Sequence, residues 1–217
     1  MKSDSEIQKD VIAELHWEPT VNAAEIGVEV QDGIVTLAGH VTNYPGKWNA
    51  ERAAERVHGV IALVTEIDVT LAGSTRRTDA DIIRSARDIL QWTTDAPEGA
   101  VRMSVELGVI TLSGTVAWEY QRQDAADAVR NLLGVKGVLN SITLKPDVST
   151  SVSKTGIEAA LKRSATADRE SIKVAVNGSE VTLTGSVHSW SERNLAKESA
   201  WAAPGVRSVI DQMIAAY

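Results

Sequence analysis

Residues 34–41, Ile-Val-Thr-Leu-Ala-Gly-His-Val, return as Val-Ile-Thr-Leu-Ser-Gly-Thr-Val at 109–116 and as Glu-Val-Thr-Leu-Thr-Gly-Ser-Val at 180–187. Twenty residues after the glycine of each stretch stands a Gly-Val pair, at 59–60, 134–135 and 205–206. Twenty-four residues before each glycine stands a leucine: Leu15, Leu90 and Leu161. Agreement at several positions without a gap is typical of internal repeats. The sequence therefore predicts three copies of one unit.

Each repeated stretch is the second half of a predicted β-hairpin. The preceding residues alternate apolar and polar, with Ile26, Val28 and Val30 in the first copy, and this period of two is typical of a half-buried strand. The turn positions are Asp32-Gly33, Leu107-Gly108 and Asn177-Gly178. Asp-Gly and Asn-Gly favour hairpin turns because both residues tolerate positive φ.

Helical patterns flank the hairpin, and a last apolar run closes each copy. Ile7, Val11 and Leu15 share one helical face before the hairpin, and a stripe of mostly small residues, beginning at Ala50 and Ala53, follows it. We predict an α+β fold of three tandem α-β-β-α-β units, each with two helices packed on one face of a three-stranded mixed sheet. The units are placed at residues 4–70, 78–146 and 153–217. The repeated glycines are predicted to be structural: Gly39, Gly59, Gly114, Gly134, Gly185 and Gly205.

This order of a helix leucine, a Val-x-Val strand, Thr-Leu-x-Gly-x-Val, a second helix and Gly-Val resembles the BON domain (bacterial OsmY and nodulation domain). The resemblance covers nearly the whole chain in three copies. It implies the fold described above, a link to osmotic and envelope stress, and attachment to phospholipid membranes. It also implies potassium sensing in one cytosolic branch, and it carries over no catalytic residues.

Composition excludes several classes of protein. The chain has no cysteine, which excludes disulfides, thiolate metal sites and thiol catalysis. The first residues lack the apolar run of a secretory signal, and no stretch approaches the roughly 18 apolar residues of a membrane span, so we expect a cytoplasmic protein. A net charge of −7 disfavours nucleic acid as a partner of the whole chain.

No catalytic or cofactor site emerges from the polar residues. The four histidines occupy unrelated repeat positions, without the spacing of metal ligands, and no phosphate-binding or dinucleotide-binding glycine pattern is present. We therefore predict no enzyme activity, no metal and no cofactor. Carboxylates of the second helices are expected on a solvated outer face: Glu51, Glu55, Asp124 and Asp127.

Aromatic residues gather after the hairpin in all three copies, and they are the candidate interaction residues: Tyr44, Trp48, Trp118, Tyr120 and Trp190. Such rings favour interfaces with proteins or membranes, but Trp is also usually well buried, which favours rings that close the end of their own core. Trp17 and Trp92 stand at equivalent positions after the first helix, where the third copy has Arg163. For these two we expect a packing role, including packing between units.

Charge differs between the copies. Asp and Glu against Lys and Arg number 12 against 4 in residues 4–70, 9 against 7 in 78–146 and 7 against 8 in 153–217, which gives −8, −2 and +1. If a phosphate-rich surface is contacted, the third unit supplies the candidate residues, Lys162, Arg163, Arg169 and Lys173.

Three functional hypotheses follow. The first is a non-catalytic interaction protein of stress physiology that binds phospholipid membranes or protein partners. The second is a sensor in which the acidic first unit binds a potassium-like cation or a small ligand. An enzyme is the third, and it would require a constellation of side chains around a pocket between units.

Overall fold

The computed structural model describes residues 2–97, 99–145, 152–163 and 172–215. Each predicted unit is present with the same element order. Unit 1 contains α1 (Asp4–Trp17), β1 (Ile26–Gln31), β2 (Ile34–Val41), α2 (Tyr44–Glu55) and β3 (Ala62–Val69). Unit 2 contains α3 (Asp79–Thr93), β4 (Val101–Glu106), β5 (Val109–Val116), α4 (Glu119–Arg130) and β6 (Gly137–Leu144). Unit 3 contains α5 (Lys154–Arg163), β7 (Ile172–Asn177), β8 (Glu180–Val187), α6 (Trp190–Trp201) and β9 (Ser208–Ala215).

Each unit has its own mixed three-stranded sheet, as predicted. The repeated strand lies in the middle, antiparallel to the preceding strand and parallel to the last one, so that the order in unit 1 is β1-β2-β3. The register is the same in all three sheets, with Gly39 opposite Ile26, Gly114 opposite Val101 and Gly185 opposite Ile172. The parallel pair requires a crossover connection, which the second helix of each unit provides.

The two helices of a unit cover one face of its sheet. In unit 1, Val11 and Leu15 of α1, Ala50 and Ala53 of α2, and Leu37 of β2 are buried in one core. Units 2 and 3 have separate cores, built mainly from the same Val, Ile, Leu and Ala side chains. The alanines allow the second helix to approach the sheet closely, and the cores contain no phenylalanine, as the composition predicts.

The repeated glycines all have positive φ. The mid-strand glycines have φ of 140° at Gly39, 125° at Gly114 and 117° at Gly185. The glycines after the second helices also have positive φ, which L side chains rarely adopt, with 104° at Gly59 and 92° at Gly134.

A carboxylate at the start of the first helix holds the hairpin turn, a contact that the sequence analysis missed. The Asp4 carboxylate accepts hydrogen bonds from the backbone N–H groups of Asp32 and Gly33, at 2.9 and 3.0 Å. Asp79 repeats this contact in unit 2, where the N–H groups of Leu107 and Gly108 donate at 3.0 Å each. The same 28-residue spacing from the carboxylate to the turn was available in the sequence as its signal.

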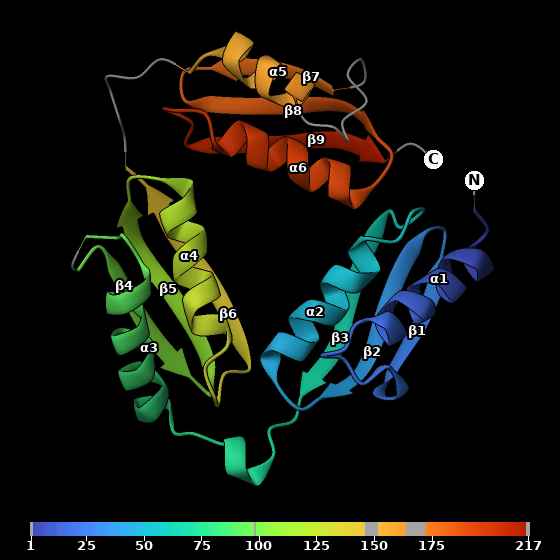
Figure 1. The fold of residues 1–217 in the computed structure, drawn as a ribbon, viewed down its shortest axis with the longest axis vertical. Coiled ribbons are helices and arrows are strands. Elements are labelled where there is room, and N and C mark those ends of the chain that lie inside the picture. Colours follow the sequence, from blue (N-terminus) through green and yellow to red (C-terminus); the bar gives the residue numbers. More distant parts are fainter. Residues whose placement is uncertain (1, 98, 146–151, 164–171, 216–217) are drawn as a thin grey trace.

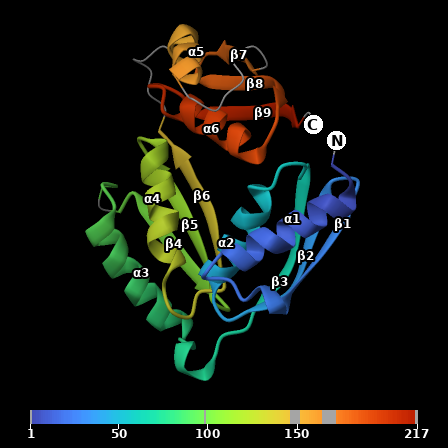
Figure 2. The same cartoon turned by 45° about the vertical axis from the view of Figure 1, so that its right-hand side comes forward.

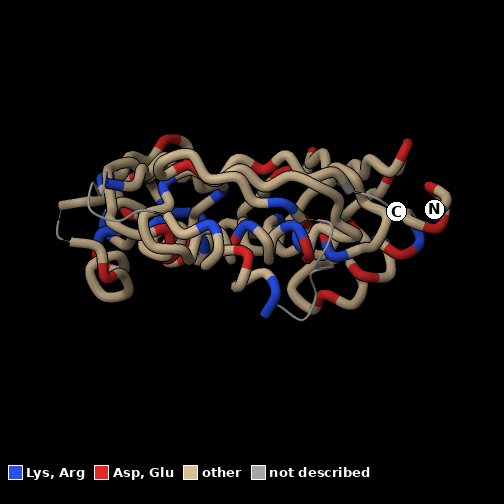
Figure 3. Tube along the Cα trace, turned by 90° about the horizontal axis from the view of Figure 1, so that it is seen from above, with Lys and Arg blue, Asp and Glu red and all other residues tan. Residues whose placement is uncertain are grey.

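The three units form a ring, with the second helices α2, α4 and α6 toward its centre and the first helices toward its rim (Figure 1). Figure 2 shows the same ring after a turn of 45°, with three separate sheets. Seen from above, the ring is a flat slab, and acidic residues are prominent near the end that carries the N-terminus (Figure 3). Two linkers join unit 1 to unit 2 and unit 2 to unit 3, whereas unit 3 meets unit 1 without a connecting segment.

Candidate functional site

The start of each second helix faces the end of the second helix in the next unit. Between units 1 and 2, the Arg130 guanidinium of α4 lies 3.8 Å from the centre of the Trp48 ring of α2, and Arg52 lies 4.9 Å from the same ring. Tyr44 packs against the core of unit 2, and its hydroxyl makes a hydrogen bond with the backbone of Val138. Burial of the Tyr44 hydroxyl raises its pKa. Two of the candidate aromatic residues therefore join unit 1 to unit 2.

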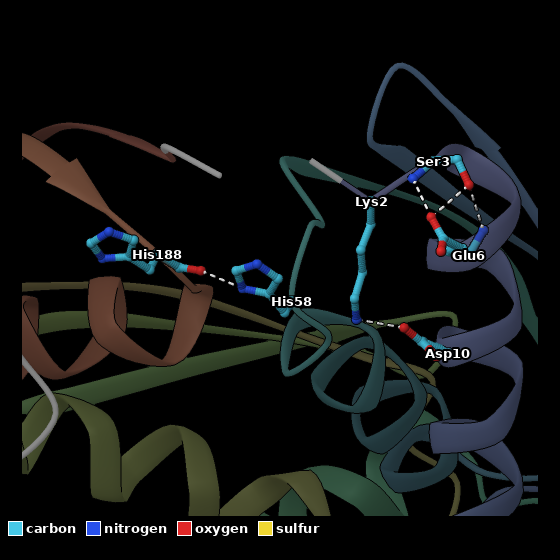
Figure 4. A network of polar contacts seen from close by, with 6 residues as sticks. All are labelled: Lys2, Ser3, Glu6, Asp10, His58 and His188. Atoms are coloured by element: carbon cyan, nitrogen blue, oxygen red, sulfur yellow. Dashed lines mark hydrogen bonds and ion pairs between the residues drawn. The ribbon is translucent and has the colours of Figure 1, made fainter.

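Unit 3 contacts unit 1 in the equivalent way, which closes the ring. Trp190, at the start of α6, packs against the core of unit 1. The backbone carbonyl of His188 lies 2.9 Å from Nδ1 of His58, which follows α2 (Figure 4). Figure 4 also shows the nearby start of α1, where Ser3 and Glu6 form a capping box. Trp190 is five residues after Gly185, as Tyr44 is after Gly39. The same repeat position therefore supplies, at both interfaces, the aromatic ring that packs against the core of the neighbouring unit, and we call it the plug position.

Between units 2 and 3, this plug position holds a carboxylate instead of a ring. The residue is Glu119, whose Oε1 pairs with Arg122 at 2.7 Å and whose Oε2 is buried without a hydrogen-bond partner. Burial raises the pKa of the Glu119 carboxyl, and the Arg122 charge offsets this only in part. Arg122 also lies 5.0 Å over the ring of Trp201, at the end of α6. The interface between units 2 and 3 thus lacks the aromatic plug of the other two.

The space left at this interface is a cavity of about 610 Å³. Its walls come from α4 and the preceding Trp118, from α6 and the following Ala202, and from Arg52 of α2. Trp118 and Tyr120, the remaining candidate aromatic residues, line this cavity and stay 47% and 50% exposed. A smaller cavity of about 320 Å³ shares Arg52 and Asn194 with it.

The polar sides of the second helices meet neighbouring units, which corrects the expectation of a simple solvated face. Asp124 and Asp127 line the larger cavity, and Glu55 lines the smaller one. Burial raises the pKa of Glu55 even though Arg52 pairs with it at 3.7 Å. These helix faces point away from their own sheets, as predicted. In the ring of three units, however, they face another unit and not open solvent.

The expectation that Trp17 and Trp92 pack between units is wrong. Their side chains are 86% and 87% exposed, at the ends of α1 and α3. The equivalent residue of unit 3, Arg163 at the end of α5, is also exposed. The three positions are equivalent in the repeat and occur at matching points around the ring, and two of them present an indole ring to solvent. The sequence did show that Trp17 and Trp92 occupy the same repeat position, but spacing alone could not show that their indole rings are exposed.

The candidate basic residues of unit 3 do not form one patch. Lys162 and Arg163 end α5, on the helix-covered side of the sheet, and both are exposed. Lys173 alternates on β7 with buried Val174, so its side chain lies on the opposite face of the sheet. Arg169 lies outside the described residues.

Two structural findings concern metals and membranes. Within the described ranges, no three His, Cys, Asp or Glu side chains come together in a way that could hold a metal ion. A search of the same ranges finds no helix with the length and apolar character needed to cross a bilayer.

Comparison with known proteins agrees with the resemblance seen in the sequence. A family model described as the BON domain matches residues 3–70, 78–146 and 150–216. Osmotically-inducible protein Y of Escherichia coli (strain K12) is 28% identical over 146 residues, which is 65% of this chain and 73% of that protein. Two structures of CdsD, a structural protein of the type III secretion system of Chlamydia trachomatis, align over 100% and 97% of this chain and 100% and 92% of their own. Their identities are 17% and 18%, and the TM-scores of 0.26 and 0.25 are too low to support an inference.

Proposed function

The chain belongs to the BON-domain family, and from this premise we propose that it is a non-catalytic interaction protein linked to osmotic stress that binds phospholipid membranes. The observation that carries the proposal is the exposure of Trp17 and Trp92 at equivalent positions, at 86% and 87%. The link to osmotic stress rests on the similarity to osmotically-inducible protein Y.

The two exposed indole rings suit a membrane–water interface. Tryptophan is enriched there because its amphipathic ring lies at the level of the lipid headgroups. Burying roughly 150 Å² of a ring at roughly 25 cal/mol per Å² is worth about 4 kcal/mol, which corresponds to a millimolar dissociation constant. Two rings on one flat molecule reach the micromolar range as an upper bound, because association costs orientational freedom. Reversible membrane attachment therefore needs both tryptophans.

Charge determines which lipid surface fits. The net charge of −7 opposes an anionic bilayer, so the indole rings rather than a basic patch carry the attachment. Arg163 occupies the third equivalent position, with Lys162 beside it, and both can pair with headgroup phosphates. We therefore expect binding to zwitterionic vesicles, and weaker binding as the anionic fraction of the vesicles rises.

Co-sedimentation of the full chain with phosphatidylcholine vesicles tests the proposal. The Trp17→Ala/Trp92→Ala double variant is expected to lose measurable binding, because each ring contributes up to about 4 kcal/mol, a factor of about a thousand in the dissociation constant. Leu107→Asn is the matched control, because it removes another exposed apolar side chain, 79% exposed, from the hairpin turn of unit 2. Circular dichroism confirms folding of each variant. Failure of the wild-type chain to sediment, or equal sedimentation of the double variant, would refute membrane binding by these residues.

A protein partner, a cation site in unit 1 and a cytoplasmic location stay predictions from the sequence. A protein partner in place of lipid would appear as capture by the wild-type chain that the double tryptophan variant loses, without any vesicle binding. No specific observation favours a cation site in unit 1. A cytoplasmic location is tested by fractionation of cells grown under osmotic stress.

A further inference from the structure

The cavity between units 2 and 3 has an unbalanced set of charges. Two of its cationic groups have ion-pair partners: Arg122 pairs with Glu119, and Arg52 pairs with Glu55. The third, Lys197, forms no ion pair within the described residues. Among its carboxylates, Asp127 pairs with Arg130 at 2.7 Å.

Two further carboxylates that line the cavity, Asp124 and Glu198, form no ion pair with any part of the chain that the structure describes. Two unpaired carboxylates stand against the one unpaired ammonium of Lys197, so the surplus of unpaired charge at the cavity is negative.

The buried carboxylate at the plug position adds to this imbalance. Oε2 of Glu119 has no hydrogen-bond partner and is closed off from solvent. A positive charge in the adjacent cavity would lower the cost of keeping this group ionised. Neither of the other two interfaces places a carboxylate at this position, since Tyr44 and Trp190 occupy it there. The feature is specific to the one interface that has the large cavity.

Aromatic rings form the other part of the wall. Trp118, Tyr120 and Trp201 all line the cavity, and they come from both units. The face of an aromatic ring attracts a cation, most strongly where water is partly excluded. Carboxylates add charge-assisted hydrogen bonds to any cation that carries N–H groups, which are stronger than neutral ones. The walls thus combine the two kinds of group that recognise an organic ammonium ion.

We propose that the cavity between units 2 and 3 binds a small aliphatic diammonium ion, held by the rings of Trp118 and Trp201 and by the carboxylates of Asp124 and Glu198. One ammonium group lies beside the carboxylate of each helix, and the methylene chain lies against the rings. Binding at this site connects α4 to α6 and so tightens the interface that lacks an aromatic plug. The site is separate from the exposed tryptophans of the rim.

Isothermal titration of the full chain with 1,6-diaminohexane tests this site. Hexamethonium is the matched ligand, because it has the same chain length and charge but no N–H groups. The Asp124→Asn/Glu198→Gln variant changes two exposed side chains of the cavity, and Asp88→Asn/Glu106→Gln makes the same charge change at exposed positions elsewhere in unit 2.

We expect saturable binding of the diamine to the wild-type chain and to the control variant. We expect affinity at least about tenfold weaker for the cavity variant, because each lost charge-assisted contact is worth about that factor. Hexamethonium is expected to bind more weakly than the diamine. Absence of saturable diamine binding to the wild-type chain would overturn the site, as would equal affinity in the cavity variant. Equal binding of hexamethonium would overturn the assignment to an N–H-donating amine.

Discussion

Replacing Gly114 by alanine is expected to destabilise unit 2 strongly. Gly114 has φ of 125°, and a Cβ atom built on it would stand 2.1 Å from the carbonyl oxygen of Ala100 and 3.1 Å from its carbonyl carbon. Real Cβ atoms essentially never approach another atom closer than 3.0 Å, and here the obstacle is backbone rather than a flexible side chain. Relief requires a movement of the start of β4 relative to β5, where Gly114 pairs with Val101.

The magnitude of this effect follows from the size of the unit. The unfavourable φ alone costs roughly 1–3 kcal/mol, and broken pairing at the β4 end adds roughly 1 kcal/mol for each lost hydrogen bond. One such bond is donated by the N–H of Thr115 to the Ala100 carbonyl, at 3.1 Å. A unit of this size has roughly 3–10 kcal/mol of stability in total, from about 0.05–0.15 kcal/mol per residue. With this one bond lost, the total cost is about 2–4 kcal/mol, which is a large part of that stability.

Urea unfolding followed by tryptophan fluorescence and circular dichroism measures this effect. Gly73→Ala is the control, since Gly73 lies in the linker with no atom within 4 Å of the added Cβ. The Gly114→Ala variant should show an early transition that comprises about a third of the ellipticity, and Gly73→Ala should match the wild-type chain. A Gly114→Ala variant with wild-type stability would refute the reasoning that this glycine is required by its backbone position.

Three further predictions concern the interfaces and the hairpin. Glu119→Gln is expected to stabilise the chain at pH 7 but not in acid. Burial raises the pKa of the Glu119 carboxyl in the folded chain, so the ionised carboxylate costs stability at neutral pH, and protonation restores that stability as the pH falls. Urea midpoints of the variant and of the wild-type chain that differ equally at every pH from 4 to 8 would contradict this. Arg130→Ala removes the guanidinium 3.8 Å from the Trp48 ring and should cost about 1 kcal/mol in thermal unfolding, whereas Arg84→Ala, an exposed residue of α3, should not. Asp79→Ala leaves the N–H groups of the unit 2 turn without their acceptor and should cost about 1–2 kcal/mol and speed their hydrogen exchange; unchanged exchange would show that the carboxylate is dispensable.

Much of the fold could be predicted from the repeat register. The alternation at Ile26, Val28 and Val30 identified a strand, and the Asp32-Gly33 turn fixed the hairpin to the following strand. The spacing of Gly39 and Gly59 placed a helix between two parallel strands, and both glycines have positive φ. These features depend on local backbone preferences and on burial within one unit, which a single sequence records.

The contacts between units could not be predicted in this way. Tyr44 and Trp190 pack against neighbouring units, whereas Trp17 and Trp92 are exposed. In the sequence, all four are aromatic residues near the end of a unit, and nothing distinguishes the two pairs. Periodicity reports which side of a helix faces its own sheet, but it does not report what covers the opposite side. The sequence therefore predicts that the polar faces of α2, α4 and α6 are solvated, although they line the interior of the ring of units.

Closure of the ring between units 1 and 3 is the central structural claim, and cross-linking tests it most directly. The chain has no cysteine, so a His58→Cys/His188→Cys variant carries a single reactive pair. Nδ1 of His58 lies 2.9 Å from the His188 carbonyl, and we therefore expect a short bis-maleimide to form an intramolecular cross-link at high dilution. A His16→Cys/His188→Cys control, at the end of α1 away from unit 3 (Figure 1), should not cross-link. Failure of the first pair to cross-link, or equal cross-linking of both pairs, would contradict a closed ring.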